Sequence, residues 1–340
     1  MKSFWSNLPQ PFFALAPMEA VTDVVFRHVV QRAGAPDVFF TEFANATGWV
    51  HAGDKAIAGR LLKTDDEHPL VAQIWGGEPG DMEQFAAHCA RLSFDGIDIN
   101  MGCPAKSAIK SGGAALIRRP DVAVAAIHAA KTAGLPVSVK TRLGYTHVNE
   151  WREWLQILLE QNIVNLTIHL RTKKEMSKVP AHYELIDDIV TLRDAVAPHT
   201  LLTINGDIRD REYGLALASE HPGVNGIMIG RGVFANPFCF AAKDTRYLHS
   251  QNNPEQNETI SKNNDSEAVQ YTELFGLLYY HLDLFDRYQP QTGRPFETLK
   301  RFFKIYVKGF DGAKELRDQL MHTASTDEVR QILRTHSTTL

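Results

Sequence analysis

The sequence is poor in cysteine, and the few cysteines that it has show no pairing pattern. Cys89, Cys103 and Cys239 are odd in number and widely spread, and none belongs to a C-x-x-C pair. This spacing argues against a disulfide framework and against a structural zinc site, and it favours a reducing compartment. We therefore expect free thiols.

Two further shortages narrow the class of protein. No apolar run is long enough to span a bilayer, and the first residues, Met1-Lys2-Ser3-Phe4-Trp5, lack the apolar run of a signal peptide. The net charge of the 340 residues is only −4, so an anionic partner must be met by a local basic patch and not by the overall field. With 44% hydrophobic and 22% charged residues, the composition is that of an ordinary globular protein, which we expect to be cytoplasmic.

Eight short apolar or β-branched runs alternate with helical stretches up to about residue 242. Most runs are continuous and not alternating, which favours parallel strands buried on both faces. Helices such as Pro79–Ser93, Asp121–Ala133 and Asp210–Ser219 lie between them. Eight strand–helix units predict an α/β protein with a (β/α)₈ TIM barrel, and a doubly wound open sheet is the less favoured alternative. The expected strands are Phe12–Ala16, Val38–Thr41, Leu70–Trp75, Gly96–Ile99, Pro136–Val139, Val164–Ile168, Thr200–Ile204 and Asn225–Ile229.

The rest of the chain differs in composition. His249–Glu267 holds five asparagines and a single aliphatic residue, Ile260, so it cannot bury a core. We read residues 243–266 as a polar linker between a catalytic barrel domain, residues 1–242, and a small all-helical bundle, residues 267–340. The bundle is expected to have about four helices, the first at Tyr271–Arg287.

The segment Arg294–Phe310 predicts one two-faced helix within this bundle. From Arg287 to Lys308 there are six basic residues and one acidic residue, although the whole chain is negative. A solvated helix face is the usual explanation of such a run, and a surface that meets RNA is the other. The apolar arc is Phe296, Leu299, Phe302, Phe303, Tyr306, Val307 and Phe310, and the basic arc is Lys300, Arg301, Lys304 and Lys308.

In a TIM barrel the chemistry sits at the carboxyl ends of the strands. Each predicted strand end brings a polar, cationic or glycine-bearing element to this rim, where a purely structural barrel has no reason to concentrate them. In chain order they are Pro17-Met18-Glu19, Glu42, Gln73, Asn100 with Cys103, Lys140 with Arg142, His169 with Arg171 and Lys173, Asn205-Gly206-Asp207, and Gly230-Arg231-Gly232.

The pentapeptide Asn100-Met101-Gly102-Cys103-Pro104 places a thiol on a turn at the end of a buried strand. Gly102 relaxes the backbone beside the thiol, and Pro104 fixes the conformation after it. A free thiol is mostly protonated at neutral pH, because its reference pKa is about 8.5. Cys103 can therefore give a proton to a carbon or, once ionised, attack one; a buried structural cysteine is the alternative.

The loops after the last two strands form the common phosphate site of such barrels. Asn205-Gly206-Asp207 and Gly230-Arg231-Gly232 supply backbone N–H groups and a guanidinium for an anion. The second loop continues into a G-x-G-x-x-A match to the dinucleotide fingerprint, but no βαβ unit follows it. A mononucleotide such as FMN is therefore the better ligand.

Two inward-pointing side chains suit a flavin ring. Lys140 could neutralise the negative charge of the reduced ring, and Gln73 offers a donor and an acceptor to the ring edge. The alternative for Lys140 is an ion pair inside the barrel.

Nine motifs follow one another through all eight predicted strands. They are Ala16-Pro17-Met18-Glu19-x-x-x-Asp23, Thr41-Glu42-Phe43, Gln73-x-x-Gly76, Asp98-x-Asn100-x-Gly102-Cys103-Pro104, Gly112-Gly113-Ala114-Ala115-Leu116, Val139-Lys140-x-Arg142-Leu143-Gly144, His169-x-Arg171-Thr172-Lys173, Asn205-Gly206-Asp207-Ile208 and Met228-Ile229-Gly230-Arg231-Gly232. Together they closely resemble the tRNA-dihydrouridine synthases. The helical C-terminal region is similar to the tRNA-recognition domain of that family in position and kind.

The resemblance implies FMN as cofactor and NADPH as reductant, with hydride delivered to C6 of a uracil and a proton from Cys103 to C5. It assigns to the cofactor Pro17, Met18, Glu19, Gln73, Lys140, His169, Asn205, Gly206, Asp207, Gly230 and Arg231. We assign to the RNA substrate the rim residues Glu42, Asn100, Arg142, Arg171 and Lys173, with Arg171 facing either the flavin phosphate or the RNA, and from the basic helix face Arg301, Lys304 and Lys308.

The expected partner is tRNA, without membrane or metal, and the chain is expected to act as a monomer. The sequence differs from the family pattern at Leu170, in the segment after Lys173, and at Ala181-His182-Tyr183, which affects the substrate loop and not the cofactor site. Two other functions stay open. One is an FMN-dependent oxidoreductase acting on a free pyrimidine or another small molecule, and the other is an RNA-binding protein with vestigial flavin chemistry.

Overall fold

The computed structural model describes residues 3–242 and 265–337. It divides the chain into two compact units, Met1–Asp23 with Pro36–Arg231, and Val24–Ala35 with Gly232–Leu340. Residues 243–264 of the predicted linker lie outside the described residues, and its last two residues belong to a helix. The domain boundaries at residues 242 and 267 stay a prediction; the structure groups Val24–Ala35 with the C-terminal helices.

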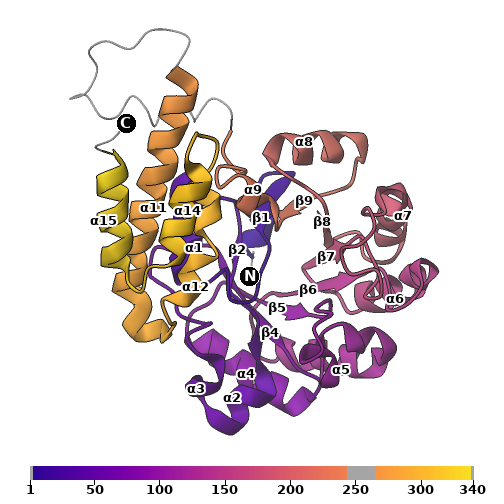
Figure 1. Ribbon diagram of the computed structural model, residues 1–340. Helices are drawn as coiled ribbons and strands as arrows, with labels where there is room; N and C mark the ends of the chain where they lie inside the picture. The colour runs from indigo at the N-terminus through magenta and orange to yellow at the C-terminus, as the bar shows by residue number, and fades with distance from the viewer. Residues whose placement is uncertain (1–2, 243–264, 338–340) are drawn as a thin grey trace. The chain divides into compact units, whose positions relative to one another are not determined.

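The first unit is built around a parallel sheet that closes into a barrel (Figure 1). The strands follow the order β1-β9-β8-β7-β6-β5-β4-β2, and a bridge between Ala14 and Val38 joins β1 to the chain just before β2. This closed parallel order confirms the predicted TIM barrel and excludes the open sheet. The strands are β1 (Phe12–Leu15), β2 (Phe39–Phe40), β4 (Leu70–Trp75), β5 (Gly96–Asn100), β6 (Val137–Arg142), β7 (Asn165–His169), β8 (Leu201–Asn205) and β9 (Gly226–Ile229).

One short strand was not expected from the sequence. The two-residue β3 (Ala44–Asn45) pairs with the end of β4 at Ile74 and Trp75. Asn45 then caps the helix that follows, because its side-chain oxygen accepts from the backbone N–H of Gly48 at 2.5 Å. The pair is too short to show a periodic pattern in the sequence.

Alternate residues of each strand face the barrel interior. Phe13 faces the helix layer, where the guanidinium of Arg211 lies 4.4 Å from the centre of its ring, whereas Phe12 and Ala14 belong to an apolar cluster inside the barrel. Phe12 is in register with Gly226. A Cβ at Gly226 would lie 2.3 Å from the Phe12 ring, so only glycine fits opposite this phenylalanine.

The predicted barrel helices are present, with their ends shifted by one or two residues. Asp210 caps its helix as predicted, because its carboxylate accepts from the N–H of Tyr213 at 2.8 Å. The helices of the first unit are α2 (Ala46–Ala52), α3 (Asp54–Ile57), α4 (Pro79–Arg91), α5 (Pro120–Lys131), α6 (Trp151–Leu159), α7 (Ile186–Val196) and α8 (Arg211–Glu220). Its 3₁₀ helices are η1 (Phe4–Asn7), η2 (Ala108–Lys110), η3 (Gly113–Arg118), η4 (Val148–Glu150) and η5 (Tyr183–Leu185).

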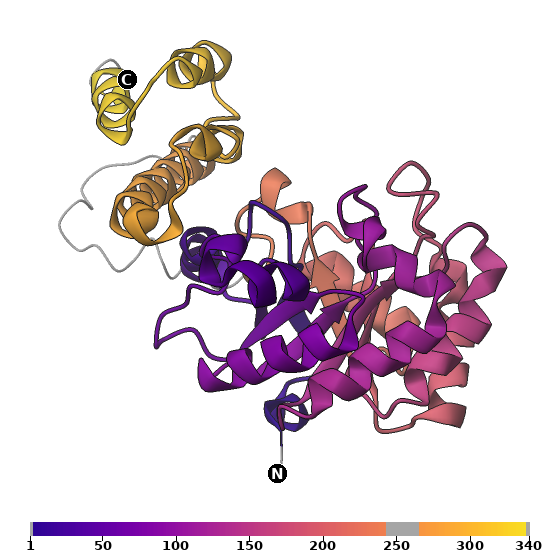
Figure 2. The same ribbon diagram turned by 90° about the horizontal axis from the view of Figure 1, so that it is seen from below.

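Helix η1 lies at one end of the barrel, where the indigo N-terminal segment is visible in Figure 2. Its Trp5 is buried and contacts Phe12 edge to face, with ring centres 5.7 Å apart. The indole therefore extends the apolar cluster of the interior to this end of the barrel.

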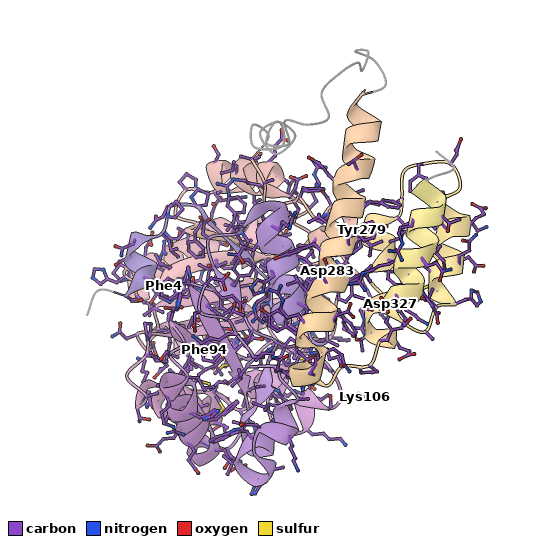
Figure 3. All side chains as sticks on the ribbon, turned by 90° about the vertical axis from the view of Figure 1, so that its left-hand side faces the viewer. Phe4, Phe94, Lys106, Tyr279, Asp283 and Asp327 are labelled. Atoms are coloured by element: carbon purple, nitrogen blue, oxygen red, sulfur yellow. The ribbon has the colours of Figure 1, made fainter. Side chains whose placement is uncertain are left out.

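The second unit is helical. Arg330 of the last helix pairs with Asp283 at 2.7 Å and with Asp327 at 3.3 Å, and Figure 3 shows these two carboxylates on neighbouring helices. The elements are α1 (Val24–Gly34), α9 (Gly232–Ala235), α11 (Asp265–Thr292), α12 (Glu297–Lys300), α13 (Phe303–Tyr306), α14 (Ala313–Met321) and α15 (Thr326–Ser337).

The prediction of a single helix at Arg294–Phe310 is wrong. The segment contains two four-residue helices, α12 and α13, with Arg301 and Phe302 between them in a turn. Backbone bonds here join residues three apart, from the N–H of Leu299 to the carbonyl of Phe296 at 2.9 Å and from Phe302 to Leu299 at 3.0 Å. Most of the predicted apolar side is buried, namely Leu299, Phe302, Phe303, Tyr306 and Val307, whereas Phe296 and Phe310 are partly exposed and the buried Ile305 was not predicted.

Candidate active site

Cys103 lies on the turn after β5 at the rim of the barrel, where its position is fixed from three sides. Its carbonyl accepts from the N–H of Ala114 at 3.0 Å. The carbonyl of Gly102 accepts from Nε of Arg142 at 2.7 Å, and a Cβ at Gly102 would lie 3.3 Å from the backbone of Thr141. The turn thus packs directly against β6, so glycine is needed there for close approach.

The thiol of Cys103 is partly exposed, whereas Cys89 and Cys239 are buried. Burial of the thiol raises the pKa of Cys103 above its ordinary value, and the nearby Arg142 opposes this effect. The thiol is therefore protonated at neutral pH and can act as a proton donor without a separate acid to recharge it first.

The side chain of Asn100 is already in use beneath this turn. Its Oδ1 accepts from the N–H of Gly102 at 3.1 Å and of Cys103 at 2.9 Å, and its Nδ2 donates to Oε1 of Gln73 at 2.9 Å. Gln73 is buried and its Nε2 donates to Asp98 at 2.6 Å. Both amides predicted to meet ligands thus carry hydrogen bonds within the protein, and each has one further N–H for a ligand.

Lys140 projects from β6 and is partly exposed at the floor of the site. Its Nζ donates to Oδ1 of Asn205 at 3.3 Å, which is a neutral partner and not the carboxylate of the expected alternative. Burial, with the nearby Arg142, lowers the pKa of Lys140 to about 8. A lysine held in this way gains from an anionic ligand that touches it.

His169 at the end of β7 lies among cations. Nη1 of Arg171 donates to Nε2 of His169 at 3.0 Å, and a guanidinium can only donate, so the imidazole carries its proton on Nδ1. Burial, followed by the charges of Arg142, Lys140, Arg171 and Arg231, holds the pKa of His169 far below its ordinary value. The ring is neutral across the physiological range.

Asp207 is the carboxylate that balances this cluster. It pairs with Arg171 and, at 3.2 Å, with Arg231, and it accepts from the N–H of Ala181 at 3.0 Å. Arg171 is buried and Arg231 is two-thirds exposed. One carboxylate thus faces two guanidiniums, so the strand ends of β8 and β9 keep an excess of positive charge, as the predicted phosphate site requires.

The backbone of this site has a conformation at Gly206 that favours glycine. Gly206 has φ +128°, and a Cβ there would lie 3.2 Å from the His169 ring, so glycine is required for both conformation and space. Its carbonyl accepts from the hydroxyl of Tyr183 at 2.5 Å. Tyr183 was not predicted as a site residue, because nothing in the local pattern marks a tyrosine that reaches the next strand end.

The loop after β1 forms the other side of the rim. Pro17 is buried, and the N–H of Met18 donates to Oγ1 of Thr22 at 3.0 Å. Glu19 forms an ion pair with Arg60, which sequence analysis missed because Arg60 lies far from any motif. A Cβ at Gly230 would lie 3.5 Å from Ala16 and 4.0 Å from the sulfur of Met18, so this loop borders the end of β9.

Of the rim residues predicted to meet RNA, some are buried and others are partly exposed. Glu42 and Arg142 are buried, and Nη1 of Arg142 donates to the carbonyls of Thr172 at 3.1 Å and Met176 at 2.9 Å. Arg142 therefore ties the β7 loop to the Cys103 turn. Lys173 is partly exposed, with its Nζ 4.9 Å from the ring centre of Tyr145.

Two residues of the rim, Arg118 and Tyr145, were not predicted from the sequence. The guanidinium of Arg118 lies 4.0 Å from the ring centre of Tyr145, the same ring that Lys173 approaches. Arg118 is exposed. The pair adds a cation near the loops after β5 and β6 that no sequence motif marked.

In the second unit, basic side chains line a groove of about 680 Å³. Arg301 and Lys304 are exposed there, as predicted for the basic arc. Lys308 instead donates to the carbonyl of Ala235 and does not line the groove. Its lining residues are Lys300, Arg301, Phe303, Lys304, Lys314, Glu315, Arg317, Asp318, Gln319 and Met321.

Among residues 3–242 and 265–337, no group of three or more His, Cys, Asp or Glu side chains could hold a metal ion. Within the same described ranges, no helix has the length and hydropathy that a membrane span needs.

A parallel barrel that gathers a partly exposed thiol, buried amides and a cluster of cations at the carboxyl ends of its strands defines the class of this protein, an α/β barrel with a candidate active site at that rim. A model of the dihydrouridine synthase (Dus) family matches residues 14–339. The chain is 56% identical over 334 residues to a Bacillus subtilis (strain 168) protein named probable tRNA-dihydrouridine synthase 2, covering 98% of this chain and 96% of that one. It is 54% identical over 336 residues to a probable tRNA-dihydrouridine synthase of Staphylococcus epidermidis (strain ATCC 35984), with the same coverage. This chain belongs to the dihydrouridine synthase family.

Among solved structures, a 2-naphthoyl-CoA reductase complex matches 70% of this chain and 50% of its own, with 10% identity and a TM-score of 0.48. A likeness this distant has no bearing on function.

Proposed function

We propose that this protein reduces uridine in tRNA to 5,6-dihydrouridine, with FMN as its bound cofactor and NADPH as the reductant. The observation that carries the proposal is the partly exposed, protonated thiol of Cys103 beside the cation cluster of the strand ends. Cys103 and Lys140 lie close enough for each to affect the other's charge. A tRNA substrate would place the enzyme in the cytoplasm.

The residues of the rim fit FMN by their charge. Lys140 donates its hydrogen bond to the neutral Asn205, and Asp207 is shared between two of the cations around His169, Arg171 and Arg231. Arg231 and the backbone around Gly206 would hold the phosphate, and Lys140 would lie against the ring. When bound, FMN would supply the hydride for C6 of the uracil.

Cys103 supplies the other half of the reaction. Its S–H bond breaks as a C5–H bond forms, and the thiolate left behind takes a proton from solvent before the next turnover. The raised pKa of Cys103 keeps the thiol protonated before this step and lets the thiolate recover a proton readily after it. The hydrogen bonds of Asn100 to the turn keep the sulfur in place.

The basic groove of the second unit supports the RNA part of the proposal. Arg301, Lys304 and Lys314 are exposed cations around it. A flipped uridine costs a few kcal/mol of lost stacking, so remote phosphate contacts are needed to offset that loss. A free pyrimidine would need no such surface.

The test uses tRNA that lacks dihydrouridine. Purified protein should be yellow, release FMN on denaturation, and form dihydrouridine with NADPH. Cys103→Ala should keep FMN and its reduction by NADPH but form dihydrouridine 10²–10⁴-fold more slowly, the usual loss of a general acid. Formation at the wild-type rate would contradict the role of Cys103.

The groove is tested by charge reversal of Arg301, Lys304 and Lys314 together. Activity on tRNA should be lost while NADPH oxidation by a small electron acceptor continues, and each lost phosphate contact should lower the log–log salt slope of binding by about 0.7–0.9. Lys55→Glu, an exposed change on α3, is the control. Turnover of free uridine at the rate of tRNA would favour the small-molecule function instead.

A further inference from the structure

A chain of buried side chains connects Asp98 to the turn of Cys103. Oδ2 of Asp98 accepts from Nε2 of Gln73 at 2.6 Å, and Oε1 of Gln73 accepts from Nδ2 of Asn100 at 2.9 Å. Oδ1 of Asn100 then accepts from the N–H of Cys103 at 2.9 Å. Asp98 and Gln73 are fully buried, and Asn100 is only 6% exposed.

The groups at the two ends of this series of hydrogen bonds allow only one direction of donation along it. An ionised carboxylate can only accept and a backbone N–H can only donate, so both amides between them can have one orientation alone. If either amide turned over, two N–H groups or two oxygens would face each other at both of its contacts. The sequence contained one signal of this arrangement, an aspartate within the otherwise apolar strand Gly96-Ile97-Asp98-Ile99.

We propose that Asp98 is a positioning residue for the reaction, because its carboxylate fixes the orientation of Gln73 and Asn100 and thereby holds the Cys103 turn in place. The proposal rests on the proposed role of Cys103 as proton donor. Asp98 touches neither substrate nor cofactor. It acts only through the two amides.

The surroundings of Asp98 keep the carboxylate as an acceptor. Its second oxygen accepts from the hydroxyl of Ser138 at 2.6 Å, and Lys140 on β6 is the charged group that faces it. Burial raises the pKa of Asp98 to about 6, and the bonds from Ser138 and Gln73 together with Lys140 oppose the rise. Protonation below that pH removes the negative charge from the acceptor of Gln73 and adds an O–H donor to the group, which weakens the chain at its first bond.

The experiment compares Asp98→Asn with Ser138→Ala in the FMN-loaded enzyme. Asp98→Asn keeps the shape but removes the charge and replaces one acceptor oxygen by a donor, so neither orientation of the new amide reproduces the two acceptors of the carboxylate. Turnover on tRNA should fall at least tenfold, while the KM for tRNA and the rate of flavin reduction by NADPH stay within twofold. The wild-type rate should fall as pH drops through about 6, following Asp98, and this dependence should vanish in the variant. Ser138→Ala removes the other bond of the same carboxylate and should keep turnover within about twofold.

A second readout does not depend on turnover. Cys103 is the partly exposed cysteine and the other two are buried, so the rate of alkylation by iodoacetamide reports on this turn. Asp98→Asn should change that rate at least threefold, with an unchanged melting temperature and circular dichroism spectrum, and Ser138→Ala should not. Wild-type turnover and labelling in Asp98→Asn would overturn the proposal, and so would a parallel loss of flavin reduction and folding, which marks a merely structural role. If Cys103→Ala were fully active, the proposed chemistry would fail while the labelling comparison would still decide whether Asp98 holds the turn.

Discussion

The two halves of the barrel interior are built in different ways. The half formed by β9, β1, β2 and the start of β4 is apolar, and the half from the middle of β4 round to β8 is polar. The first is stabilised by removing surface from water, which does not depend on direction. In the second, hydrogen bonds at defined distances hold each side chain in one orientation. The apolar side is Trp5, Phe12, Ala14, Ala16, Val38, Phe40, Val71 and Met228, and the polar side is Gln73, Asp98, Asn100, Ser138, Lys140, Asn165, Thr167, His169, Thr203 and Asn205.

Within one barrel, the apolar half thus mainly stabilises the fold and the polar half mainly positions side chains. The residues assigned to chemistry lie at the carboxyl end of the polar half, where side chains from other strands or loops orient them, as Asn205 of β8 orients Lys140 of β6. Four substitutions test whether the halves are as separate as their composition suggests. They are ordered by the expected change in the free energy of unfolding.

Phe12→Ala should have the largest effect. The Phe12 ring is buried against Trp5 and Gly226, and emptying such a site costs about 3–5 kcal/mol. Urea unfolding measures the loss. Flavin affinity of the folded fraction should not change, and a tenfold drop would show that the apolar half also positions the site.

Lys140→Met should stabilise the apoprotein. The pKa of Lys140 is lowered in the fold to about 8 from 10.5, so the unfolded chain binds the proton more tightly and the charge disfavours folding below pH 8. The gain should be on the order of 2 kcal/mol at pH 7 and should shrink as pH rises from 8 to 10.5. Paired unfolding curves across this window measure it.

The same variant should bind flavin at least tenfold more weakly, because a charge-assisted bond to an anion is worth about 1.5–3 kcal/mol. A gain in stability without that loss would separate Lys140 from the cofactor. A difference in stability that does not vary with pH would contradict the burial of its charge.

Thr203→Val tests the deep layer of the polar half. Oγ1 of Thr203 donates to Oδ1 of Asn165 at 2.7 Å, and the change removes this donor with little change in shape. The loss should be about 1 kcal/mol, measured by urea unfolding. Adding Asn165→Leu should recover only part of it, since this change removes the unsatisfied Oδ1 but also takes the Nδ2 donor from Oγ1 of Thr167. Unchanged stability in Thr203→Val would show that this bond does not hold the layer.

Arg231→Ala should change stability least. The side chain is 67% exposed and Asp207 keeps its pair with Arg171. The free energy of unfolding should therefore change by less than about 0.5 kcal/mol. Flavin titration should nevertheless show at least tenfold weaker binding, if this guanidinium holds the phosphate. Unchanged affinity would place the phosphate elsewhere on the rim.

The sequence predicted the barrel well because its strands are buried on both faces. Runs such as Leu70–Trp75 and Gly96–Ile99 are apolar apart from Gln73 and Asp98, and the structure has strands at both. The strand-end motifs also located the site, since the carboxyl ends of parallel strands necessarily meet at one rim.

The remaining differences have physical reasons. Phe296, Leu299 and Phe302 are spaced by three, which a 3₁₀ geometry matches as well as an α-helix does, so most of the apolar arc was predicted correctly but the continuous helix was not. The contact of Arg142 with RNA stays a prediction. What the sequence did not show is that its guanidinium donates to backbone carbonyls, a role that depends on where loops pass in space and leaves no local pattern.

The pairing of β1 with β9 has a consequence for how the protein is made. Phe12 precedes its partner Gly226 by 214 residues (226 minus 12), so most of the barrel is synthesised between the two. Until then β1 has an open edge and an apolar face beside it, which are the surfaces that promote aggregation of nascent chains. A ribosome that stalls between β8 and β9 would therefore release a chain with nearly all of its catalytic residues but no closed barrel to hold them.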